Sequence, residues 1–228
     1  MAKSISVRHV EKLNIPDGIT EVAKANVPLG SIKKSKTIFI AERHKFTVFE
    51  CEFTKDISEE ISVYIQKLEN YFDLSHYKKK FSFKIFYSSE KKILFSEAPT
   101  PVTKSFLSAL ENTEGIEFEF KTMHFAFDKV EQLFNQTKGI RFDSNDRGVT
   151  QKLFNGNKVD SNSEALSAIQ SDSATQIIGV IELLSHPYTV TLTQSGTIMS
   201  FTKINDFQDK EFPMLEFAVN LLQKIGML

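Results

Sequence analysis

The chain has 228 residues, a formal net charge of −1 and ordinary shares of apolar and charged residues, which suits one large domain or two small ones. The near-neutral charge excludes a global field that would draw the protein to nucleic acid or to a membrane. Cys51 is the only cysteine, so an internal disulfide and a cysteine-based zinc site are also excluded. The lone thiol, with no apolar span and no secretion signal, predicts a cytoplasmic protein without membrane contact.

Phenylalanine and charge are distributed unevenly along the chain. There are 21 Phe, 5 Tyr and no Trp, so most of the core is expected to consist of Phe rings. Residues 1–96 carry a charge balance of +5 and residues 97–228 carry −6. This asymmetry permits a basic face on the N-terminal half, although scatter over a solvated surface explains it as well.

The first hundred residues predict strands and one clear helix. Residues 4–10 can form a short strand, and 19–36 mix apolar residues with Pro, Gly and Lys, as in an irregular segment. Residues 37–53 and 81–98 are rich in β-branched and aromatic residues around polar turns, which predicts two hairpins. Residues 57–72 carry an apolar stripe at helical spacing. Its members are Ile61, Tyr64, Ile65, Leu68, Tyr71 and Phe72.

The middle of the chain predicts alternating helices and strands around a polar stretch. Residues 100–115 predict a helix with Pro101 in its first turn, and 116–127 predict a half-buried strand. Residues 128–139 predict a second helix, and 161–169 a short third one with Ser161 and Glu164 at capping-box spacing. Between them, residues 143–160 have no periodicity, and loops of that length are usually functional or mobile.

The last third predicts three strands and a helix. Residues 175–184 are apolar at nearly every position, as in a central strand. Residues 188–204 predict a hairpin that turns at Gly196, and 209–226 predict a long helix that ends at Gly226. The fold class expected is α+β: mainly antiparallel sheet with helices packed on its faces, in strand meanders each followed by a helix.

The domain expected is a single one over residues 1–228. A division into residues 1–139, a polar insert at 140–173 and a C-terminal unit at 174–228 is the alternative. No linker is rich enough in Pro, Gly or Ser to mark a boundary.

One strand carries a pattern that metal-dependent nucleases also use. Glu117, Glu119 and Lys121 occupy alternate positions and therefore point to one face. Carboxylates could hold Mg²⁺ while the lysine assists the attacking water, and Asp143 and Asp146 could complete the site. The same pattern arises by chance on the outer face of a strand, so catalysis is not the favoured hypothesis. Under any other hypothesis no metal or cofactor is expected.

Two polar tracts are candidates for binding. Lys78, Lys79, Lys80 and Lys84 are interleaved with Tyr77, Phe81 and Phe83, as in sites that bind single-stranded nucleic acid, although Phe81 and Phe83 are expected to point into the core. The second tract lies in the polar loop. Its candidate residues are Asp143, Asp146, Arg147, Asn155, Asn157 and Lys158.

Three function hypotheses follow. The favoured one is a non-catalytic binding or interaction protein that contacts a protein partner or nucleic acid, within a multi-protein prokaryotic or mobile-element system such as one of phage conflict. The second is the Mg²⁺-dependent nuclease. The third is a self-assembling structural subunit joined through a sheet edge.

Overall fold

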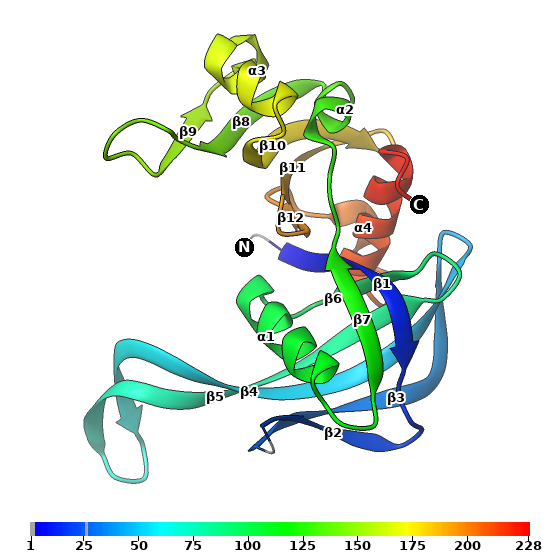
Figure 1. The fold of residues 1–228 in the computed structure, drawn as a ribbon, viewed down its shortest axis with the longest axis vertical. Coiled ribbons are helices and arrows are strands. Elements are labelled where there is room, and N and C mark those ends of the chain that lie inside the picture. Colours follow the sequence, from blue (N-terminus) through cyan, green and yellow to red (C-terminus); the bar gives the residue numbers. More distant parts are fainter. Residues whose placement is uncertain (1–2, 26) are drawn as a thin grey trace.

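A twelve-stranded antiparallel sheet organises the molecule. The computed structural model describes residues 3–25 and 27–228. Their strands follow one another in space in the order β2-β3-β4-β5-β6-β1-β12-β11-β10-β8-β9, and β7 pairs with β1 off this path (Figure 1). The prediction of a mainly antiparallel sheet is therefore confirmed.

The twelve strands vary widely in length. They are β1 (Lys3–Asn14), β2 (Ile19–Lys24), β3 (Val27–Ala41), β4 (His44–Ile65), β5 (Asn70–Ser88), β6 (Ile93–Ser96), β7 (Glu117–Thr122), β8 (Gln136–Asp143), β9 (Gln151–Asn155), β10 (Ala174–Leu183), β11 (His186–Thr193) and β12 (Thr197–Ser200). The helices are α1 (Thr100–Glu111), α2 (Phe127–Glu131), α3 (Ser163–Gln170) and α4 (Pro213–Lys224), with short 3₁₀ turns at Val159–Ser161 and Asn205–Phe207.

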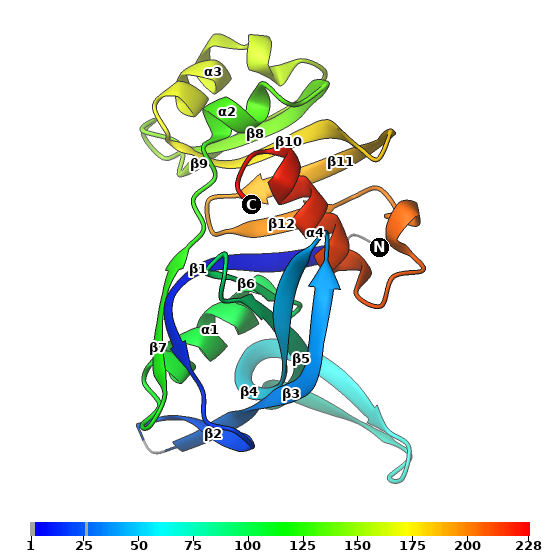
Figure 2. The same cartoon turned by 90° about the vertical axis from the view of Figure 1, so that its right-hand side faces the viewer.

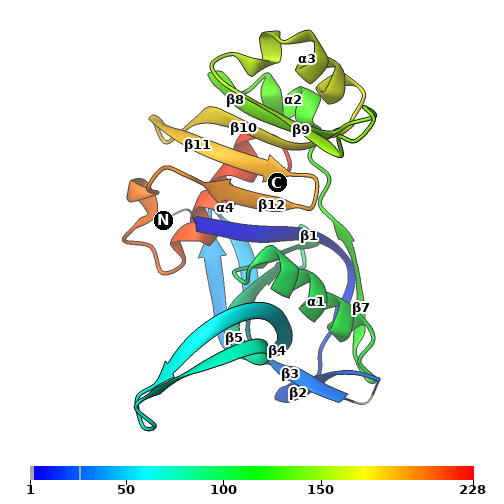
Figure 3. The same ribbon diagram turned by 90° about the vertical axis from the view of Figure 1, so that its left-hand side faces the viewer.

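Strand β1 joins two halves of the sheet. Its first residues, Lys3–Ser6, pair with β12, and its last, Arg8–Asn14, pair with β7, while residues 6–9 also pair with β6. Strands β8 to β12 and α4 make up one half, and β2 to β7 and α1 make up the other. The core cluster of the first half extends into the second, because it includes Phe46, Phe86 and Phe95 of β4, β5 and β6, and a separate cluster packs around α1 in the second half. Figures 2 and 3 show these halves stacked along the long axis of the molecule. The half of β8 to β12 is called the upper half below, and the half of β2 to β7 is called the lower half.

Phenylalanine forms the centre of both cores, as the composition predicts. In the lower half, Phe106 of α1 is fully buried and meets Phe53 and Phe83 edge-on, with ring centroids 5.6 and 5.2 Å apart. In the upper half, Phe217 of α4 packs edge-on against Tyr188. These contacts fix α1 and α4 on their respective sheet faces.

The expectation that each strand meander is followed by a helix is not confirmed, because the helices are few. Strands β1 to β6 follow one another without a helix, and α2 has only five residues. The helix predicted at 128–139 is thus wrong in most of its length, since β8 begins at Gln136 and pairs with β10. Tertiary pairing outweighs the local helix signal there.

The helix predicted at residues 57–72 is wrong. Residues up to Ile65 continue β4, the chain turns over 66–69, and β5 begins at Asn70. The ladder from Ile57–Tyr77 to Ile65–Asn70 satisfies the backbone that a helix would have satisfied internally. The apolar stripe is therefore divided between two strands.

Two segments predicted to be irregular or loop-like also belong to the sheet. Residues 19–24 form β2, and residues 27–36 form the first part of β3. The polar stretch 143–160 contains β9, which pairs with β8, and α3 is capped by the Asn162 side chain rather than by Ser161. The 140–173 segment thus extends the sheet through β8 and β9.

Candidate functional site

A long β-hairpin projects from the lower half of the molecule. Strands β4 and β5 have 22 and 19 residues, whereas strands commonly have three to ten. Strand β3 accompanies β4 only as far as Phe53, and β6 accompanies β5 only from Ile85. Residues 54–80, called the arm below, therefore have only each other as ladder partners within the described part of the chain. All three views show the arm curving away from the body (Figures 1, 2 and 3).

The arm's two edges differ in regularity. Ser58 pairs with His76 and Ile61 pairs with Leu74, so β4 places two residues opposite the single Ser75 of β5. This bulge interrupts the outer edge of β4 and bends the hairpin. Strand β5 keeps an unbroken alternation along the arm.

Large apolar side chains cover the outer part of the arm and face solvent. Ile61, Val63, Phe72 and Leu74 form two cross-strand pairs on one face, whereas Tyr64 pairs with Tyr71 on the other face at a centroid separation of 5.0 Å. Tyr71 is 67% exposed and Leu68, in the turn, is 61% exposed. The exposed set comprises Val63, Tyr64, Ile65, Leu68, Tyr71, Phe72 and Leu74. So many exposed apolar residues on one projection are typical of an interaction surface.

Charge divides the arm into two regions. Residues 57–76, the tip, hold four acidic residues and Lys67, a balance of −3. Residues 54–56 and 77–80, the root, hold four lysines and Asp56, a balance of +3. The arm is thus a dipole with its positive end at the body.

The root lysines predicted to bind are present together, and some have partners within the chain. Lys80 forms a 2.8 Å ion pair with Glu52, and the Lys79 ammonium lies 5.5 Å above the Phe81 ring. Lys78 stands opposite Asp56. Phe81 and Phe83 pack against the lower core as the alternation predicts. The lysines therefore extend from a rigid base.

The hydroxyl of Tyr77 donates a hydrogen bond to the Glu59 carboxylate across the arm. This bond, together with the negative charge of Glu59, raises the pKa of Tyr77. Tyr77 therefore stays neutral near pH 7 and links the two strands where root and tip meet.

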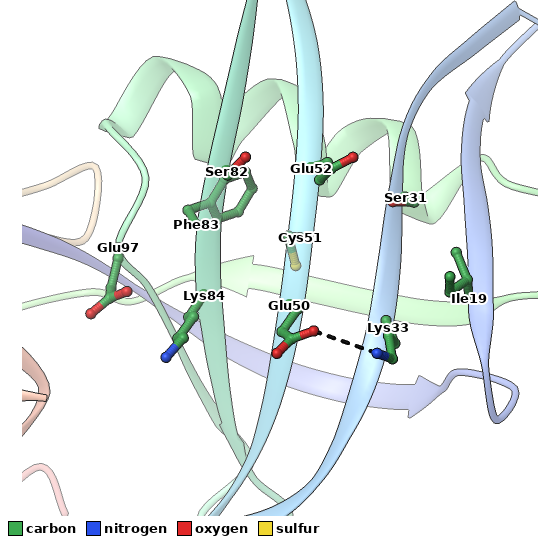
Figure 4. Close-up of a pocket in the computed structure, with 10 residues that line it drawn as sticks. All are labelled: Ile19, Ser31, Lys33, Glu50, Cys51, Glu52, Ser82, Phe83, Lys84 and Glu97. Carbon is green, nitrogen blue, oxygen red and sulfur yellow. Dashed lines mark ion pairs between the residues drawn. The ribbon is translucent and has the colours of Figure 1, made fainter. Parts of the chain in front are cut away.

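A cavity of about 650 Å³ opens beside the root on the outer face of β3, β4 and β5 (Figure 4). Ser82, Phe83 and Lys84 form its β5 wall, and Ile19, 74% exposed, stands at its far side. An ion pair of 3.7 Å joins Lys33 to Glu50 on its floor. The cavity is a polar, open depression with one apolar rim.

Burial shifts the pKa of two titratable groups that line this cavity, Cys51 and Glu97. Burial raises the pKa of the Cys51 thiol well above its usual value, so the thiol is neutral and a poor nucleophile. Burial also raises the pKa of Glu97, against the opposing effect of Lys84. None of the described residues that line this cavity is a histidine.

The structure divides the nuclease candidates between the two halves. Glu117, Glu119 and Lys121 are exposed on β7 in the lower half, where Lys121 pairs with Glu11 at 2.5 Å. Asp143 ends β8 and Asp146 lies in the β8–β9 connection of the upper half, where Asp146 pairs with Lys152 at 2.6 Å. Across residues 3–25 and 27–228, no three His, Cys, Asp or Glu side chains are placed to hold a metal ion.

The other loop candidates surround the β8–β9 hairpin. Lys138 and Gln136 both donate to the Asn157 side chain, at 2.9 and 3.0 Å. Lys158 adopts a left-handed backbone conformation before the 3₁₀ turn, and Arg147 and Asn155 are exposed. These residues organise a loop in the upper half, whereas Lys78, Lys79 and Lys80 lie on the arm of the lower half.

The residues that sequence reasoning missed are the exposed aromatic and aliphatic residues of the tip. Their helical spacing suggested a stripe buried against the body. A competing signal is present: residues 61–63 alternate Ile-Ser-Val, and residues 72–75 alternate Phe-Asp-Leu-Ser. Such alternation, with β-branched residues, favours strands.

Comparison with known proteins assigns no family. No protein-family model matches this sequence, and no curated protein is significantly similar to it. Among the described residues, no helix is both long enough and apolar enough to span a bilayer.

Proposed function

We propose that this chain is a non-catalytic interaction protein that binds a protein partner through the arm. The observation that carries the proposal is a projecting hairpin with seven exposed large apolar side chains. A two-stranded hairpin is only marginally stable in water and gains stability when another strand or surface covers it. The cost of exposing these residues is explained if a partner covers them.

The charge of the tip favours protein over nucleic acid as the partner. Nucleic acid binding depends on neutralising phosphates, and the tip carries a balance of −3 where its aromatic residues are most exposed. The lysines lie at the root, where Glu52 and Asp56 offset part of their charge. The exposed aromatic residues of the tip, Tyr64, Tyr71 and Phe72, are thus separated along the arm from the lysines of the root.

The experiment is to shorten the arm and compare the proteins retained. Asp56 and Lys78 are direct cross-strand partners, so Asn-Gly can replace residues 57–77 as a two-residue hairpin turn. We expect the parent chain to retain a protein from an extract of its native host, or a second copy of itself, that the shortened chain does not retain. Equal thermal unfolding of the two chains would show that the body is intact.

Two results would contradict the proposal. Identical retained proteins and identical self-association for both chains would mean that the arm is not the docking element. Absorbance at 260 nm that co-purifies with the parent, is removed by salt and is absent from the shortened chain would identify nucleic acid as the arm's ligand.

A further inference from the structure

We propose that the partner of the arm is the arm of a second copy, joined antiparallel along the free edge of β5 about a two-fold axis at His76. This inference rests on the proposed function, because it specifies what the arm binds.

The free edge of β5 is suited to strand addition. Among the described residues, β5 has a ladder partner from Asn70 to Phe83 on its β4 side only, because β6 begins to pair at Ile85. Exposed backbone donors and acceptors on such an edge pair readily with another strand. The edge of β4 is less suitable, because the bulge at residues 59–60 interrupts it.

The charge of the arm is complementary to itself in one orientation. Antiparallel pairing places the tip, at −3, beside the root of the other copy, at +3. Parallel pairing would place like charges together. An antiparallel contact about a two-fold axis is also closed, so it gives a dimer rather than a filament.

The register centred on His76 separates the lysines. Two-fold pairing places side chains of the same strand face opposite each other, so Asp73 of each copy stands opposite Lys79 of the other. Lys78 then meets Leu74, and Lys80 meets Phe72, so no lysine stands opposite another. Opposite charges directly across an antiparallel pair stabilise it, and like charges destabilise it.

This register also covers exposed residues at the end of the tip with the root and the cavity of the second copy. Tyr71 of one copy stands opposite Phe81 of the other, which is anchored against the lower core. The turn at residues 66–69 reaches the β5 wall of the other copy's cavity, at Ser82, Phe83 and Lys84 (Figure 4). Leu68, the exposed residue of that turn, can then be covered.

A cysteine at the axis tests the register. In His76→Cys the two introduced thiols face each other, because opposite residues of antiparallel strands lie about 4.5–5.5 Å apart, within the range for a disulfide. Cys51 is buried and does not compete. We expect a disulfide-linked dimer under mild oxidation. The matched control is Gln66→Cys, an exposed position in the turn, because the two turns lie at opposite ends of the paired arms.

Charge exchange tests the complementarity. We expect Asp73→Lys and Lys79→Glu each to raise the dimer dissociation constant at least tenfold, and the double variant to restore it, as measured by sedimentation equilibrium. Lys34→Glu, on β3 outside the arm, is the control. A parent chain that is monomeric throughout, no rescue in the double variant, or equal cross-linking at positions 66 and 76 would overturn the inference. Arm-dependent retention of a different protein by a monomeric parent would overturn this inference alone and leave the proposed function standing.

Discussion

Replacing Tyr71 by serine is expected to raise the dissociation constant of the arm-dependent complex about 100-fold for each Tyr71 ring that the complex covers. The side chain is 67% exposed in the single chain, and a tyrosine carries roughly 200 Å² of buriable surface, so about 130 Å² is available to a partner. At about 25 cal/mol per Å², covering that area contributes ~3 kcal/mol. Each 1.4 kcal/mol corresponds to about tenfold in affinity, which gives roughly two decades.

The assay for this prediction is the dissociation constant of the arm-dependent complex, from sedimentation equilibrium. Tyr71→Phe keeps the ring and is expected to stay close to the parent. Phe201→Ser removes a comparably exposed ring, at 53%, from the upper half and is the matched control. A Tyr71→Ser complex within threefold of the parent would show that the ring stays in water, and it would refute the argument that a partner covers the tip.

Three further predictions concern the body that carries the arm. A Cβ on Gly30 would collide with the backbone carbonyl of Glu52, so Gly30→Ala should cost about 2 kcal/mol in denaturant unfolding. Gly156→Ala should be nearly neutral, because its Cβ would meet only Val159, at an ordinary contact distance of 3.8 Å. Phe106→Ala should lower the free energy of unfolding by about 3–5 kcal/mol in the same assay, because the ring is fully buried; a loss under 1 kcal/mol would contradict that packing. Burial raises the pKa of Glu216, so its carboxylate destabilises the folded state above the unfolded pKa, and this effect disappears as pH falls below that value. Glu216→Gln should therefore be more stable than the parent at pH 7 and equal to it near pH 3. Equal stability of the two chains at both pH values would contradict a raised pKa for Glu216.

The sequence predicted the elements whose hydrophobic pattern and tertiary environment agree. The hairpin at 37–53 is present with its turn at Glu42 and Arg43, both of which have positive φ. The helix at 100–115 is present as α1, and the strand at 175–184 is present as β10, paired on both sides. In each case local propensity, periodicity and burial favour the same structure.

The elements that could not be predicted depend on pairing between segments rather than on local pattern. Gly30 belongs to a strand because only a glycine allows the backbone of Glu52 to approach so closely. Helix α2 ends after five residues because β8 pairs with β10. Strand pairing over such separations has no signature in a single sequence. The local pattern therefore predicts an irregular segment at residues 19–36 and a helix at residues 128–139.

The candidate site was predictable only at its root. Lys78, Lys79 and Lys80 could be selected as a basic tract next to aromatic residues, and the structure places them together at the root of the arm. The separation of charge between root and tip depends on the hairpin, so it could not be recognised while residues 57–72 were expected to form a helix. Tyr64 and Tyr71 could not be selected for the same reason.

The failure of the helix prediction and the proposed function have a common physical cause. In a helix, the stripe from Ile61 to Phe72 would bury its apolar residues on one face. In the hairpin the same residues point to both faces of a two-stranded ribbon, and most remain exposed. Natural sequences rarely retain such a conflict between local pattern and global fold except where function requires it. A second surface on the arm resolves the conflict, because it covers the apolar residues that the body of the chain leaves in water.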